Sequence, residues 1–256
     1  VPGEEIPCCF GDGGRLCRLN LRTGELKVLL EDPLGGIRDP NVHYDGNKIL
    51  FSYRRGGTET YHLYEIDADG SRLRQLTDGP DNDIEPIYLP DGGILFCSSC
   101  CHRFVPCWRP QVAVLYRCDR DGKNIRMVSN NAEQENTPWM LPDGRVLYMR
   151  WEYVDRNFGD AQGVWVTNPD GTNHAIYWGN NTNSPGAVLD ARAIPGSRKL
   201  VAVLHGHHTW QAGELALIDR ERGTQEAAGV ELIAPVREAE AVKVEDLGTP
   251  GLDLHP

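Results

Sequence analysis

The sequence predicts an all-β fold, a β-propeller of four-stranded antiparallel blades, on three observations. Short apolar strands that follow Asp-Gly turns recur through the chain. Equivalent turn glycines, such as Gly46, Gly92 and Gly144, follow one another at intervals close to fifty residues. Almost no stretch has helical periodicity, with 237–244 a weak exception. Short strands with turn signals, repeating about every 40 to 50 residues, are typical of propeller blades.

Each repeat has two halves. In the first half, an inner strand leads through an Asp-Gly turn to a second strand. In the second half, a third strand leads through an Asp-x-Asp-Gly turn, such as 67–70, to an outer strand, such as 73–77. Glycine suits these turns because it has no Cβ to oppose a positive φ. The inner strands are expected at 39–44, 84–89, 136–141 and 188–194.

The repeats make four complete blades and part of a fifth. Residues 15–30 supply only the outer hairpin of the fifth blade. Its inner strands come either from the C-terminal segment, at 230–234 and 241–245, or from outside this chain. The C-terminal segment lacks the Asp-Gly signature, which favours an incomplete piece of a larger propeller. We therefore expect an N-terminal lead-in at 1–14, the propeller at 15–234, and a tail or the start of a further blade at 235–256.

Composition restricts the partners. The 256 residues carry a formal net charge of -11, so there is no basic excess to displace counterions from a nucleic acid. No apolar run reaches the roughly 18 residues of a membrane span. No signal peptide is visible, but the chain begins with Val rather than Met, so the compartment stays open.

One face of the propeller is expected to carry long loops. Strand alternation puts the Asp-Gly and Asp-x-Asp-Gly turns on one face, and the second-to-third and blade-to-blade connections on the other. Long, irregular loops on a rigid scaffold commonly carry function, and we call this second face the loop face. Three of its loops have unusual chemistry: 97–111, 150–163 and 205–213.

The first of these loops is a cysteine-rich insert. Cys97 and Cys100 have the C-x-x-C spacing that lets two thiolates bind one ion. His102 and Cys107 are the expected further ligands of a tetrahedral zinc ion. One alternative is a disulfide from Cys100 or Cys101 to Cys107, with Cys97 buried on its strand, and another is inert thiols. The insert is not a haem-attachment motif, because Cys101 separates Cys-x-x-Cys from His102.

The second loop is rich in histidine. Alternate residues of an extended segment face the same side, so His205 and His207 are a second candidate metal pair. The alternative is a hydrogen-bonded support for the loop. Gln211 lies nearby in the sequence and is a candidate ligand contact.

The third loop combines an aromatic ring with charges. Arg150, Trp151 and Glu152 suit a polar, planar or sugar-like ligand. The alternative, which we favour, is an interblade salt-bridge network packed over Trp151. No Gly-x-Ser-x-Gly motif or phosphate-binding Gly-rich loop is present, and no serine has a sequence context that marks it as a nucleophile.

Two resemblances add to these patterns. Residues 69–77 and 82–92 resemble the WD40-like repeat of the TolB and dipeptidyl-peptidase propellers, which implies a scaffold rather than an activity. A narrower resemblance is to the propeller region of hydrazine synthase alpha-subunit-like proteins. It is carried by 96–99, 144–153, 167–172, 193–197, 206–208 and 213–219.

The narrower resemblance implies a large exported bacterial protein in which the propeller is one domain. The enzyme of that family carries c-type haems with a zinc ion near one of them, and a propeller cysteine is a zinc ligand. The resemblance therefore implies Cys97 or Cys100 as the zinc ligand. This chain has no Cys-x-x-Cys-His, so haem is expected only from another domain or chain.

The sequence thus predicts the propeller domain of an exported multidomain protein, periplasmic or otherwise extracytoplasmic in a bacterium. Its loop face is expected to contact a ligand or cofactor, with zinc the candidate, in a hydrazine-synthase-alpha-like redox assembly. The expected partners are other domains or subunits of that assembly. One alternative is a lyase-like carbohydrate-active propeller, with a metal at the histidines and an acidic sugar at Arg150, Trp151 and Glu152. Another is a protein-interaction scaffold.

Overall fold

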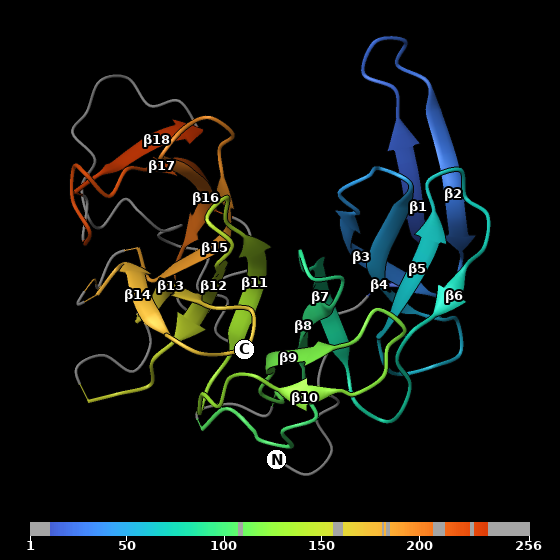
Figure 1. The fold of residues 1–256 in the computed structure, drawn as a ribbon, viewed down its shortest axis with the longest axis horizontal. Coiled ribbons are helices and arrows are strands. Elements are labelled where there is room, and N and C mark those ends of the chain that lie inside the picture. The colour runs from blue at the N-terminus through green and yellow to red at the C-terminus, as the bar shows by residue number, and fades with distance from the viewer. Residues whose placement is uncertain are drawn as a thin grey trace.

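A computed structural model describes residues 11–106, 110–155, 161–180, 182, 185–206, 213–225 and 228–234. In these segments the structure contains strands and no helix, and β3 to β18 form four successive four-stranded blades, the last two joined by the single parallel pair Gln162–Ala187 (Figure 1). Accordingly, the described segments include no helix that is long and apolar enough to cross a membrane.

The blades follow one another in chain order. Blade 1 consists of β3 (Gly36–Val42), β4 (Lys48–Arg54), β5 (His62–Asp67) and β6 (Arg74–Gln75). Blade 2 consists of β7 (Asp83–Tyr88), β8 (Ile94–Ser98), β9 (Val114–Cys118) and β10 (Arg126–Met127). Blade 3 consists of β11 (Glu135–Met140), β12 (Val146–Trp151), β13 (Gln162–Thr167) and β14 (Ala175–Trp178). Blade 4 consists of β15 (Ala187–Ala193), β16 (Leu200–His205), β17 (Glu214–Ile218) and β18 (Val230–Ala234).

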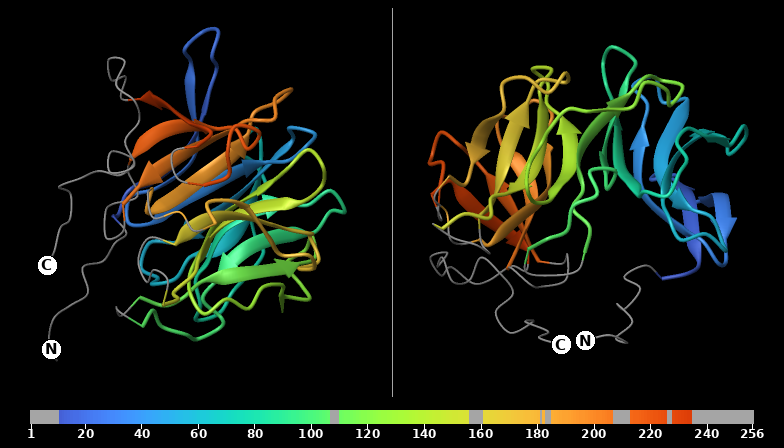
Figure 2. Two further views of the ribbon diagram at one scale, coloured as in Figure 1. Left: turned by 90° about the vertical axis from the view of Figure 1, so that its left-hand side faces the viewer. Right: turned by 90° about the horizontal axis from the view of Figure 1, so that it is seen from below.

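A separate two-stranded hairpin precedes blade 1. It pairs β1 (Gly14–Leu19) with β2 (Leu26–Asp32), as the outer hairpin predicted at 15–30 requires. Seen from below in Figure 2, the blades run in order from this blue hairpin to the orange and red strands of blade 4. The prediction of four complete blades and part of a fifth is confirmed, and each predicted inner strand overlaps the observed one.

One alternative for closing the ring is wrong. Val230–Ala234 is not an inner strand of the fifth blade, because it pairs antiparallel with β17 as the outer strand of blade 4. The pairing runs from Leu215–Ala234 to Ile218–Val230, and the Asp219 N–H donates to the Gly229 carbonyl at 2.8 Å just beyond it. The proposed second inner strand, 241–245, lies outside the described residues.

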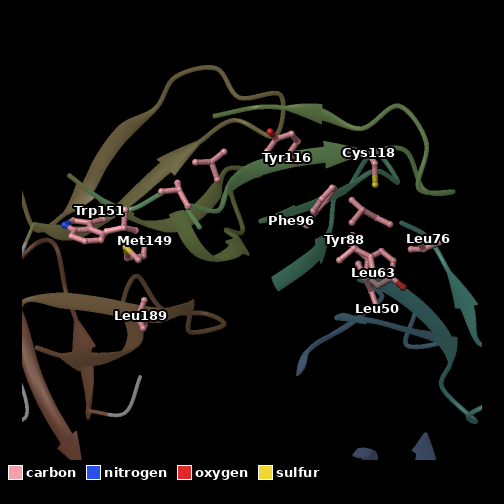
Figure 3. Close-up of a cluster of buried hydrophobic side chains, with 14 residues drawn as sticks. Leu50, Leu63, Leu76, Tyr88, Phe96, Tyr116, Cys118, Met149, Trp151 and Leu189 are labelled. Carbon is pink, nitrogen blue, oxygen red and sulfur yellow. The ribbon is translucent and has the colours of Figure 1, made fainter. Parts of the chain in front are cut away.

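The blades pack through apolar side chains on both of their faces. One buried cluster joins all four blades, and it includes Leu50 of β4, Phe96 of β8, Trp151 of β12 and Leu189 of β15 (Figure 3). All five residues of β8 are buried, because a strand covered on both faces loses the usual apolar–polar alternation. The core is therefore continuous from blade to blade.

Each inner strand contains a β-bulge at the same place. The pairing register shifts after Arg38, Ile84, Asn136 and Leu189. One residue of each bulge has a left-handed backbone, although none is glycine: Asp39 (φ 56°), Glu85 (φ 54°), Thr137 (φ 52°) and Asp190 (φ 51°). Left-handed conformations of such residues persist only where surrounding contacts hold them.

Hydrogen bonds between neighbouring blades supply those contacts. The Glu85 N–H donates to the Asp39 carboxylate at 3.1 Å, and the Thr137 N–H donates to the Glu85 carboxylate at 2.5 Å. The Asp190 N–H then donates to Thr137 Oγ1 at 3.2 Å. Side chains at the bulges thus tie each inner strand to the next one, and they line a cavity of about 330 Å³ where the four inner strands meet.

Candidate metal centre

The insert begins where β8 ends. The Ser99 N–H donates to the Asn82 carbonyl at 3.0 Å, and the Asn82 N–H donates to Ser99 Oγ at 3.0 Å. These two bonds fasten the insert to the connection that leads from blade 1 into blade 2. A turn follows, closed by the His102 N–H on the Ser99 carbonyl at 2.9 Å. The turn and the fastening together bring the insert side chains next to Asp81.

Three side chains form a candidate metal cluster. The ligand atoms of Asp81, Cys100 and His102 all lie within 4.8 Å of one another, and His102 Nδ1 is 3.6 Å from Asp81 Oδ1. Thiolate, imidazole and carboxylate are all ligands of zinc, and three protein ligands leave a fourth position open for water or another ligand. Cys100 and His102 are exposed, so an incoming ligand can reach the cluster.

The electrostatics of the cluster favour a cation. Partial burial raises the pKa of the Cys100 thiol, and the neighbouring Asp81 carboxylate raises it further. A bound metal ion reverses this balance because it stabilises the thiolate, so metal binding releases a proton. The donor set therefore fits zinc.

Cys97 lies elsewhere, although its C-x-x-C spacing predicted that it would share an ion with Cys100. Its side chain is fully buried, and Sγ is 3.0 Å from the Glu135 carbonyl and 3.7 Å from the Glu85 carboxylate. Burial raises the pKa of Cys97 well above its usual range, and the two glutamates add to the shift. The two cysteines are separated because β8 ends between them: Cys97 lies within the strand, and Cys100 lies in the loop that follows it.

The remaining cysteines leave the disulfide alternative untested. The five cysteines in the described segments are free thiols: Cys17, Cys97, Cys100, Cys101 and Cys118. Cys101 Sγ donates to the Val112 carbonyl at 3.2 Å, inside the insert. Cys107, the expected disulfide partner and possible zinc ligand, lies outside the described residues.

The histidine pair is described only in part. His205 is buried at the end of β16, and its Nδ1 is 2.7 Å from the Gly206 carbonyl oxygen. Burial lowers the pKa of His205, which favours the neutral imidazole. His207 and Gln211 lie outside the described residues, so the second metal pair stays a prediction.

Arg150 pairs with Glu135 of its own blade and packs on Trp165, not on Trp151 as the favoured alternative had it, and the link to blade 2 is made by Glu135. Its guanidinium is 3.1 Å from the fully buried carboxylate of Glu135, and it lies 4.9 Å from the centre of the Trp165 ring. The same carboxylate accepts hydrogen bonds from Ser129 Oγ at 2.5 Å and from the Leu115 N–H at 3.2 Å, both in the preceding segment of chain.

The two residues that follow Arg150 have different surroundings. Trp151 is buried in the shared core and packs edge-on against Tyr153. Glu152 is partly exposed, and its backbone N–H donates to the Ala161 carbonyl at 2.8 Å. A sugar-stacking role for the Trp151 ring would require its exposure, so the structural interpretation fits this residue better.

Sequence reasoning missed two acidic residues on the loop face. Asp81 stands two residues before β7, and Glu133 stands two residues before β11, so they occupy equivalent positions in successive blades. A signal for these two positions was present in the sequence. Each blade entry has two carboxylates with one residue between them, Asp81-x-Asp83 and Glu133-x-Glu135. Only the structure shows that Asp81 meets the insert.

Comparison with known proteins agrees with the fold. No protein-family model matches the chain. A solved hydrazine synthase from Kuenenia stuttgartiensis superposes with a TM-score of 0.76 at 22% identity, over 87% of this chain and 36% of that one. TolB from Acinetobacter baumannii superposes with a TM-score of 0.54 at 15% identity, over 78% and 45%. An oligogalacturonate lyase in complex with manganese gives 0.55 at 17%, over 83% and 58%.

The chain therefore has a β-propeller fold like that of TolB. In sequence it resembles the hydrazine synthase subunit alpha of Kuenenia stuttgartiensis, with 26% identity over 278 residues that cover 85% of this chain and 34% of the relative. It spans about a third of the length of that relative.

Proposed function

We propose that this propeller presents a zinc site on its loop face, within an extracytoplasmic redox assembly like that of hydrazine synthase alpha. The observation that carries the proposal is the convergence of Asp81, Cys100 and His102. The resemblance to a protein named as one subunit of an enzyme supports the presence of partner domains or subunits. Export from a bacterial cytoplasm and haem supplied by another domain or chain belong to the same proposal.

In this proposal the chain holds and orients the ion. Cys100 supplies a thiolate, His102 an imidazole nitrogen and Asp81 a carboxylate oxygen. When bound, zinc acts as a Lewis acid that polarises a ligand in its open position. The Asn82–Ser99 hydrogen bonds hold the two segments of the site together, and His102 faces solvent, with 66% of its side chain exposed. The site is thus open to a partner or a substrate.

The carbohydrate-lyase alternative has less support. The oligogalacturonate lyase shares the fold at 17% identity, which is evidence for the scaffold alone. Two of the side chains expected to bind the sugar have structural contacts instead. Arg150 pairs with buried Glu135, and Trp151 is buried. No observation favours a sugar at this position.

Zinc titration tests the proposal. We expect the protein to bind about one equivalent of zinc, with a proton released on binding. Cys100→Ser should weaken the affinity by more than about 100-fold, since removal of even an outer-sphere partner typically costs 10- to 100-fold. Cys17→Ser, which removes an exposed thiol on β1, is the matched control and should bind as the parent does. Equal affinities of the two variants would rule out the cluster as the zinc site.

A further inference from the structure

A polar cavity lies between the four inner strands, which are found toward the middle of Figure 1. It has a volume of about 330 Å³, and β3, β7, β11 and β15 all contribute lining residues. Pockets that hold small molecules have volumes of roughly 300 to 1,000 Å³, so this cavity suits a small ligand. The residues that line it do not include those of the metal cluster.

The cavity is open to solvent. Glu85, Pro86 and Pro138 line it and are buried, whereas Pro40 and Asp190 line it and are exposed. The Asp190 side chain is 58% exposed. A small molecule can therefore enter from solvent without a movement of the chain. Because the prolines have no backbone N–H, side chains supply the donors along this part of the wall.

Two arginines line the cavity, one from the first blade and one from the fourth. Arg38 Nε of β3 donates to the Asp39 carboxylate at 2.7 Å. Arg192 Nη2 of β15 donates to the Asp190 carboxylate at 2.9 Å. Both arginines are partly exposed. An aspartate at a β-bulge thus holds each guanidinium group in place beside the cavity.

These charged groups keep hydrogen-bonding capacity for a ligand. A guanidinium carries several N–H donors, and Arg38 and Arg192 each use only two nitrogens in hydrogen bonds with described residues. Among the same residues, hydrogen bonds to Asp39 go only to Oδ2, and those to Asp190 go only to Oδ1. The second carboxylate oxygen of each aspartate is therefore available to another donor.

The charges around the cavity favour a ligand that carries both signs. An anion at the two arginines leaves the available aspartate oxygens without donors, and a cation at the aspartates is repelled by the guanidinium groups. A molecule with both signs pairs with both sets of residues and leaves the net charge of the cavity unchanged. Burial also raises the pKa of Glu85, and the Asp39 carboxylate adds to the shift, which limits the negative charge of the cavity near neutral pH.

We propose that this cavity binds a free amino acid in its zwitterionic form. Arg38 and Arg192 donate to its carboxylate, and Asp39 and Asp190 accept from its ammonium group. Hydrogen bonds between charged groups are stronger than those between neutral groups, and paired N–H donors of arginine match the geometry of a carboxylate. The site does not include the zinc ligands, and it binds its ligand whether or not the metal cluster holds zinc.

Equilibrium dialysis against an equimolar mixture of the common amino acids tests the site. The protein is first treated with a chelator, so that no bound zinc can hold an amino acid. We expect at least one amino acid to be enriched on the protein side. Acetate carries only the carboxylate and methylammonium only the ammonium group. Each should displace the amino acid at least about 10-fold more weakly than the amino acid itself does, because each lacks part of the charged hydrogen bonds.

Arg192→Met should weaken the affinity for the enriched amino acid by about 10- to 100-fold. Methionine keeps an unbranched side chain beside the Trp139 ring, whose centre lies 4.4 Å from Arg192 Cζ. The variant is expected to fold, because Asp190 is exposed and loses little by losing its partner. Arg145→Met is the matched control and should bind as the parent does, since Arg145 also pairs with an aspartate two residues away, Asp143, but outside the cavity.

Each result supports or refutes the site. The proposal fails if the parent protein enriches no amino acid, or if Arg192→Met binds as tightly as the parent does. It also fails if acetate or methylammonium competes as well as the amino acid, because a single charge would then suffice. Zinc binding is measured separately, so the failure of either proposal is distinguishable from the failure of the other.

Discussion

Replacing Glu135 with alanine is expected to lower the free energy of unfolding by about 3 to 5 kcal/mol, the range for breaking a buried ion pair. The carboxylate is fully buried and binds the Arg150 guanidinium at 3.1 Å. It also accepts the Leu115 N–H at 3.2 Å, which joins blades 2 and 3. The substitution removes the acceptor of the partly buried Arg150 guanidinium and of the buried Leu115 N–H. Urea denaturation at neutral pH measures the loss.

The matched control is an exposed ion pair in the same protein. Glu31 binds Arg15 at 2.7 Å, with about half of both side chains exposed to solvent, so Glu31→Ala should cost less than about 1 kcal/mol. If Glu135→Ala cost no more than Glu31→Ala, the interblade network would not stabilise the propeller as described.

The second large effect is a pH dependence of stability caused by Glu133. Burial raises the pKa of Glu133 from 4.5 to about 7 in the folded protein. Between these values the unfolded chain loses the proton that the folded protein keeps, so stability falls as the pH rises through this window. The loss reaches about 3 kcal/mol above the window, because each pKa unit corresponds to about 1.4 kcal/mol.

Glu133→Gln removes this loss because its amide does not ionise. The difference in unfolding free energy between the variant and the parent should therefore move by about 3 kcal/mol in favour of the variant, from about pH 4 to about pH 8. Chemical denaturation across that range measures it, and other titrating groups cancel because both proteins contain them. A constant difference would show that Glu133 titrates as an ordinary exposed carboxyl.

The propeller could be predicted from the sequence because its signals are local. Turn glycines such as Gly92 and Gly144 adopt φ of 87°, and each turn repeats its Asp-Gly context. The alternative that placed 230–234 in the fifth blade was wrong, because the segment lacks such a turn motif and only its pairing with β17 identifies its blade. The blade to which an edge strand belongs depends on the strand beside it in space, and the local sequence does not encode that partner.

The inner bulges had only a partial signal in residue type. Asp39, Glu85, Thr137 and Asp190 share a left-handed backbone and a side-chain oxygen, and the first three precede proline and accept the bonds from the next blade. Hydrogen bonds between blades hold this conformation, and such bonds depend on tertiary packing. Local propensity therefore could not have predicted them.

The candidate metal site was predicted in part. The sequence singled out the insert for its chemistry, and the structure brings Cys100 and His102 together, while zinc binding stays a prediction. Spacing alone could not show that Cys97 is inside β8, where its thiol points between blades, whereas Cys100 follows the strand end. Asp81 was missed because it reaches the insert only through the Asn82–Ser99 bonds, which connect segments distant in sequence.

The ligand set of the zinc-loaded protein shows whether Asp81, Cys100 and His102 hold the ion. X-ray absorption at the zinc edge counts sulfur ligands at about 2.3 Å and nitrogen or oxygen ligands at about 2.0 to 2.2 Å. With Asp81, Cys100 and His102 as the site, the spectrum should show a single sulfur, with the remaining ligands nitrogen or oxygen. Two or more sulfur ligands would contradict this cluster and restore the C-x-x-C chelate, and no sulfur at all would place zinc elsewhere.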